Sequence, residues 1–232
     1  MAKKFDLEEF KERLFISVVN YFENKDILNN VPHEVKGDFA LIPRVCLGNK
    51  NDAGIYSESA LVNDELLLEM EIDMDTVMDI AKSNSKNIFP GKICSITDYL
   101  DPSEGGMAPD GVVVPQVYVL TNNVGINGAA AFFYQPDLVE NLSSMIEKDL
   151  LIFPSGENEM FCIPVTGQTQ LGELQEMYTE AISELGLDEE KPLSANVLKY
   201  DSLTHMVQQM DGSSFSLSEN VNNVPRVRHS SR

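Results

Sequence analysis

Two stretches of this 232-residue chain carry side chains whose types and spacing could support chemistry. In the first stretch, Glu69, Glu71, Asp73 and Asp75 alternate with apolar residues. On a β-strand this alternation places four carboxylates on one face, where they could bind a divalent cation. However, Thr76 stands where a calcium-binding loop requires glycine. An antiparallel strand with one hydrated face has the same pattern, and Asp73 or Asp75 would then cap the helix that follows.

The second stretch places Ser155 beside Gly156 at the end of an expected strand, and Glu157 and Glu159 follow closely. A serine on such a corner, close to carboxylates, could act as the nucleophile of a hydrolase. The flanking residues do not form the Gly-x-Ser-x-Gly elbow of that class, and serine and glycine are common turn formers. A turn that ends the strand is therefore the preferred interpretation. Ser155, Glu157 and Glu159 remain the catalytic candidates of a rival one.

Patterns typical of bound cofactors are absent from the sequence. The glycines of residues 125–131 (GINGAAA) match neither the dinucleotide fingerprint nor the phosphate-binding loop. The three histidines include no pair at the spacing of zinc ligands. Cys46, Cys94 and Cys162 lie far apart in apolar surroundings, which is typical of reduced thiols in a core. The sequence therefore predicts no cofactor and no metal site beyond the segment from Glu69 to Asp75.

Charge is distributed unevenly along the chain. The 37 acidic and 17 basic residues give a net charge of −20. The whole excess lies in residues 51–200, where 26 carboxylates face six lysines, whereas both ends are neutral. Such a field repels nucleic acid and anionic membranes, and it speeds association with a basic partner. We expect a protein partner with a basic surface, although solvated acidic faces without any partner give the same composition.

The composition predicts a folded cytoplasmic protein. Apolar residues make up 43% of the chain, which is enough for a buried core in one large or two small domains. The first residues contain no uninterrupted apolar run of the kind found in export signals. No later stretch approaches the ~20 apolar residues that span a bilayer.

Apolar periodicity predicts an α+β fold with an antiparallel or mixed sheet and helices packed on one face. Helices are expected at 5–22, with Asp6 as N-cap, and at 75–86, 135–149 and 169–186. Strands are expected at 38–47, 65–74, 115–121, 127–134, 150–154 and 159–165. The asparagines and glycines of 121–128 (TNNVGING) indicate a hairpin, and such short links cannot join parallel strands.

These elements suggest four segments. Residues 1–100 form an N-terminal α+β half, and 101–114, rich in proline, glycine and aspartate, form an irregular connection. Residues 115–201 form a C-terminal half with the order ββαββα. Residues 202–232 form a tail that is expected to be disordered from about residue 212, because it is polar and lacks apolar periodicity.

Several segments resemble domain-of-unknown-function family 5688, found mainly in anaerobic gut bacteria. The likeness covers residues 11–201 and is carried by KERLFISVVNYFENKDILNNVPHE, NIFP, YVLTN, GAAAFFYQPDLVENL, DLLIFPS and ANVLKYD, in that order. The resemblance implies an intracellular α+β protein and supplies no activity. Family members typically read Ser-Ser-x-His-Glu where this chain has Ser155 to Glu159, so Asn158 stands in the position of the histidine. Asparagine cannot transfer a proton near neutral pH.

The leading hypothesis is a non-catalytic binding or regulatory module that recognises a basic protein surface through its acidic middle region. One rival is a hydrolase-like enzyme that uses Ser155 with Glu157 and Glu159. The other rival is a nucleic-acid mimic, whose carboxylates would imitate phosphate spacing to inhibit a DNA- or RNA-binding protein.

Overall fold

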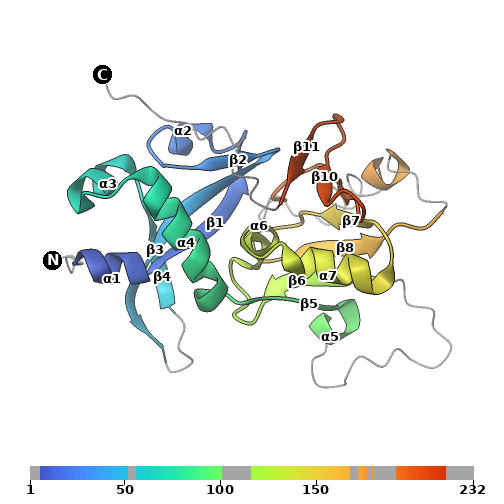
Figure 1. Cartoon of the computed structure of the whole chain (residues 1–232), viewed down its shortest axis with the longest axis horizontal. Coiled ribbons are helices and arrows are strands. Elements are labelled where there is room, and N and C mark those ends of the chain that lie inside the picture. Colours follow the sequence, from blue (N-terminus) through green and yellow to red (C-terminus); the bar gives the residue numbers. More distant parts are fainter. Residues whose placement is uncertain are drawn as a thin grey trace. The chain divides into compact units, whose positions relative to one another are not determined.

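The computed structural model describes residues 6–51, 56–100, 116–167, 172–176, 179 and 192–217 (Figure 1). The chain divides into two compact units between Pro90 and Gly91. Each unit has its own antiparallel sheet, which confirms the predicted α+β class. The connection expected at 101–114 lies outside the described residues.

Unit 1 is built on a small sheet with one long central strand. Its elements are α1 (Leu7–Glu12), β1 (Leu14–Asn20), α2 (Lys25–Leu28), β2 (Glu34–Lys36), β3 (Phe39–Lys50), β4 (Tyr56–Leu61), α3 (Asp64–Met70) and α4 (Met74–Ile88). Strand β3 pairs with β1 along one side and with β2 and then β4 along the other, always antiparallel. Pro43 lies between the β2 and β4 pairings, so its missing N–H removes no hydrogen bond from the sheet.

Helix α4 packs on β1 and β3 and also supports the edge of the sheet. The N–H of Ile16 donates to the hydroxyl of Ser85 at 2.8 Å, and that hydroxyl donates to the backbone oxygen of Ala81 at 2.7 Å. Ser85 is 0% exposed, so no water can replace it. The side chain of Asn84 donates to the backbone oxygen of Lys11. The side chains of Ser85 and Asn84, both on α4, are thus the hydrogen-bond partners of backbone groups in β1 and α1.

Two of the elements predicted in unit 1 are wrong. The helix expected at 5–22 ends at Glu12, and β1 follows, because Ile16, Val18 and Val19 are β-branched and the successive residues 14–18 are all buried. Its start is confirmed, since Asp6 caps α1 by accepting from the N–H of Glu9. The strand expected at 65–74 is helix α3, which Asn63 caps through the N–H of Leu66. Leucine, glutamate and methionine favour a helix there.

Other predictions for unit 1 are confirmed. Strand β3 overlaps the predicted 38–47 from Phe39 onward, and α4 covers the predicted 75–86. A separate cluster of Leu28, Val31, Ala40 and Ile42 forms the core beneath α2 and the loop that follows it. Tyr21 and Leu61 pack against this cluster.

Unit 2 contains a seven-stranded sheet in the order β11-β10-β9-β7-β8-β6-β5, in which every neighbouring pair is antiparallel. Its strands are β5 (Gly91–Ser95), β6 (Tyr118–Asn122), β7 (Leu150–Phe153), β8 (Met160–Pro164), β9 (Leu198–Tyr200), β10 (Met206–Gln208) and β11 (Ser214–Ser216). Its helices are α5 (Ile96–Leu100), η1 (Gly128–Ala130), α6 (Ala131–Tyr134) and α7 (Asp137–Ile146). Residues 172–176 are also helical.

Successive side chains of β7 point to opposite faces of this sheet, and both sets are buried. Leu151 and Phe153 face a cluster that includes Val197 and Leu174, the latter from the helical residues 172–176. Leu150 and Ile152 point to the opposite face and are fully buried. Figure 1 shows α6 and α7 lying across β6 to β8.

The predictions for unit 2 are confirmed for its central strands and for α7, and wrong for the segment between β6 and α7. The strand expected at 127–134 forms the helices η1 and α6, so no hairpin follows β6. Alanine favours a helix, and these residues are buried on all sides, which hides the helical period. Strands β9 to β11 extend the sheet to Ser216, past residue 212, where disorder was expected to begin. The rest of that tail, and most of the helix expected at 169–186, lies outside the described residues.

Among the residues that the structure describes, no helix has the length and apolarity to cross a bilayer.

We predict that Ser85→Ala lowers the free energy of unfolding by about 1–3 kcal/mol, because it leaves the buried N–H of Ile16 without an acceptor. Ser83→Ala is the matched control, since Ser83 lies on the same helix and is exposed. Urea unfolding of both variants measures the difference. Equal stability of the two variants would show that the Ser85 hydroxyl does not support β1.

Candidate functional site

The structure places Ser155 in a turn that its own hydroxyl closes. The hydroxyl donates to the backbone oxygen of Glu159 at 3.1 Å. The carboxylate of Glu159 accepts a hydrogen bond from Tyr99 at 3.3 Å, and Glu157 is exposed. Burial, together with the charge of Glu159, raises the pKa of Tyr99 above its ordinary value. The hydroxyl of Ser155 and the carboxylate of Glu159 therefore have different hydrogen-bond partners.

Asn158 joins this turn to the loop after β6. Its side-chain oxygen accepts from the N–H of Asn127 at 3.1 Å, and its backbone oxygen accepts from the hydroxyl of Thr121 at 2.9 Å. A Cβ on Gly128 would collide with that same backbone oxygen. Asn127 itself has a left-handed backbone, with φ of 55°. The residue that replaces the expected histidine therefore supports two loops that pack closely together.

The four carboxylates of the acidic segment do not share the face of a strand. Asp73 caps α4 by accepting from the N–H of Thr76 at 2.9 Å and from its hydroxyl at 2.6 Å, and these bonds lower the pKa of Asp73. Glu69 ends α3, and Glu71 follows it with a left-handed backbone. Within the described ranges, no group of three or more histidine, cysteine or acidic side chains is arranged to hold a metal ion.

The three cysteines are free thiols. Burial raises the pKa of Cys46 to about 11 and that of Cys162 to about 12, and it also raises the pKa of Cys94. Because the thiolate is the nucleophilic form of cysteine, such thiols are poor nucleophiles near neutral pH.

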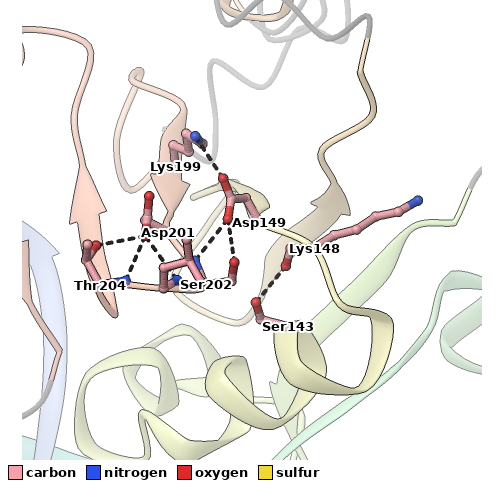
Figure 2. A network of polar contacts seen from close by, with 8 residues as sticks. Ser143, Lys148, Asp149, Lys199, Asp201, Ser202 and Thr204 are labelled. Atoms are coloured by element: carbon pink, nitrogen blue, oxygen red, sulfur yellow. Dashed lines mark hydrogen bonds and ion pairs between the residues drawn. The ribbon is translucent and has the colours of Figure 1, made fainter.

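A polar network that the sequence did not indicate lies around Asp149, between α7 and β7 (Figure 2). Its carboxylate accepts from the amine of Lys199 at 2.9 Å and from the N–H and the hydroxyl of Ser202 at 3.0 and 2.7 Å. Partial burial alone would raise the pKa of Asp149, but the bonds from Lys199 and Ser202 outweigh it and lower the pKa to about 2. Asp149 thus remains ionised and holds the start of the β9–β10 turn.

Asp201 organises the β9–β10 turn itself. Its side-chain oxygen accepts from the N–H of Leu203 at 3.1 Å and from the N–H and hydroxyl of Thr204 at 2.8 and 2.9 Å. Those bonds lower the pKa of Asp201. The sequence DSLT is typical of such a turn, although residues 202–232 are predicted to form a tail.

Three titratable side chains meet beside this turn. The hydroxyl of Tyr200 lies 2.8 Å from Nδ1 of His205, and Oε1 of Glu140, on α7, lies 3.7 Å from the same nitrogen. Burial raises the pKa of Tyr200 to about 12, with smaller contributions from the charges of Glu140 and Asp201. Nothing in the spacing of these residues along the chain indicated that they meet.

Unit 1 contains a buried group of charges of its own. The carboxylate of Glu34, on β2, lies 2.8 Å from the amine of Lys82, on α4, and 3.7 Å from that of Lys36. All three side chains are largely buried. Because two elements far apart in sequence supply the pair, its effect is to hold β2 against α4, and removal of either partner would leave a buried charge.

Residues 1–202 match the family model described as "Family of unknown function (DUF5688)", as the resemblance of residues 11–201 had suggested. No curated protein and no solved structure matches the chain.

We predict that Asp149→Asn lowers the free energy of unfolding at neutral pH by about 1–3 kcal/mol, because it removes the charge that Lys199 and Ser202 stabilise. The pKa of Asp149 is about 2 in the folded protein and ~3.9 in an unfolded chain. Its contribution is therefore present above pH ~4 and is lost as the pH falls toward ~2.

Urea unfolding between pH ~2 and ~7 measures this contribution, and Asp26→Asn, at an exposed position of unit 1, is the control. The variant should match the wild type most closely at the acidic end. A deficit that stays constant over the whole range would contradict the ionic role of Asp149.

Proposed function

The chain belongs to domain-of-unknown-function family 5688, and we propose that it is a non-catalytic binding module that recognises a protein with a basic surface. The supporting observation is the surface of α3. Seven carboxylates lie between residues 64 and 79, and no basic residue lies among them. We call Glu65, Leu68, Glu69 and Glu71 the α3 acidic face.

An apolar side chain lies at the centre of this face. Leu68 is 80% exposed, whereas its neighbour Leu67 is buried. Leu68 and Glu69 follow Glu65 by three and four residues, so both lie beside Glu65 on one side of the helix. An exposed leucine among carboxylates suits a partner surface that offers an apolar pocket bordered by lysine or arginine.

The contacts of Ser155 support a role without catalysis. Its hydroxyl donates to a backbone oxygen, whereas a serine nucleophile must be placed against a base that can take its proton. Asn158 stands where the family resemblance predicts a histidine, and its side chain accepts a hydrogen bond from the backbone N–H of Asn127.

We predict that a fluorophosphonate reagent, which labels activated serines, forms no adduct on Ser155. Mass spectrometry of the intact protein and of its peptides measures labelling, and a known serine hydrolase in the same reaction is the control. An adduct on Ser155 that is absent from Ser155→Ala would revive the hydrolase interpretation.

We predict that Glu65→Gln together with Glu69→Gln slows association with the partner about 3- to 10-fold at low salt, because long-range attraction sets the rate of encounter. The partner is first captured from a lysate of the source organism and purified. Association rates are then measured at several salt concentrations. The matched control is Glu173→Gln with Glu176→Gln, which removes the same charge from exposed positions of unit 2.

Leu68→Ala should change the dissociation rate constant rather than the association rate constant. It removes apolar contact, so the dissociation rate should rise about tenfold while the association rate changes little. The proposal fails if the association rate does not depend on salt concentration. It also fails if the two control substitutions slow association as much as the two substitutions on α3.

A further inference from the structure

His205 lies at the end of the β9–β10 turn in a conformation that is uncommon for histidine. Its φ is 56°, in the left-handed region. The turn holds it there, since its N–H donates to the backbone oxygen of Asp201 at 2.9 Å and the side chain of Asp201 fixes the preceding residues. The ring is 47% exposed, so it can exchange protons with solvent.

The ring nitrogen Nδ1 has two potential partners, and its protonation selects between them. A neutral ring with an unprotonated Nδ1 accepts from the hydroxyl of Tyr200, which lies 2.8 Å away. A charged ring carries hydrogen on Nδ1 and can only donate. The carboxylate of Glu140, 3.7 Å away, is then the stronger acceptor, because both groups are charged.

The titratable and charged groups around the ring favour this exchange. Glu140 faces it from α7 and Tyr200 faces it from β9, and the charge of Asp201, in the turn, acts on Tyr200. Tyr200, with a pKa of about 12, remains a neutral donor throughout the range in which histidines change charge. Lys199, which precedes Tyr200 in β9, pairs with Asp149.

We propose that His205 is a pH-sensitive latch: protonation transfers its Nδ1 from Tyr200 to Glu140 and so fastens the β9–β10 turn to α7. The neutral ring bonds within the hairpin, whereas the charged ring bonds to a helix that is distant in sequence. The latch lies in unit 2 and does not depend on the function proposed for α3.

The first test is the tautomer of the ring. Nitrogen NMR of labelled protein at pH ~8 should show the hydrogen on Nε2, because Tyr200 donates to Nδ1. Tyr200→Phe should raise the fraction of neutral rings that carry hydrogen on Nδ1. A wild-type ring with its hydrogen on Nδ1 at this pH would overturn the proposal.

The second test is the effect of Glu140→Gln on the thermal unfolding temperature. At pH ~5.5 the variant should unfold about 1–3 °C below the wild type, the size expected for a partly exposed ion pair, and at pH ~8 it should show no loss. In a His205→Asn background, which tolerates the left-handed backbone, the loss at pH ~5.5 should disappear. Glu176→Gln is the charge-matched control. An equal loss at both pH values, or a loss that persists with asparagine at 205, would overturn the latch.

Discussion

A buried backbone N–H that is not paired within a helix or sheet needs another hydrogen-bond acceptor, and short polar side chains supply it at several places in this protein. Ser85 accepts from the edge of β1, and Asp149 accepts from the β9–β10 turn. The residues that first suggested chemistry serve the same constraint. Asp73 caps a helix and Asn158 holds a loop. These side chains stabilise a helix start and a loop, so the proposed function is based on surface charge instead.

Part of the acidic surplus lies on α3 and in the residues just after it. Asp73, Asp149 and Asp201 accept the hydrogen bonds that hold a helix start and a turn, and the α3 acidic face combines charge with an exposed leucine. Charge of one sign governs how fast a partner arrives, and apolar contact governs how long it stays. The two properties lie within one short helix, so point substitutions can separate them.

The sequence predicts helices and strands well where N-caps or β-branched runs mark them. It predicts them poorly where a segment is buried on all sides, because its apolar residues then show no helical or strand spacing. Asp6 and Asp73 start helices as expected, and β3, β7 and β8 lie close to their predicted ranges. Acidic and apolar residues alternate from Glu69 to Asp75 although no strand forms there, and the helices of 128–134 are buried all round, so neither pattern reveals the helix. The contact between Tyr200, His205 and Glu140 depends on the pairing of β7 with β9, which no local pattern encodes.

Because β7 pairs with β9, it lacks one of its two neighbouring strands during part of the synthesis of the chain. Strand β7 lies in the middle of its sheet, yet its neighbour β9 comes from residues 198–200, whereas its other neighbour β8 follows it directly. Until residue 200 has left the ribosome, β7 is an open edge with apolar side chains and unpaired backbone groups. A nascent chain that pauses after β8 therefore exposes a surface suited to chaperones or to mispairing with another copy.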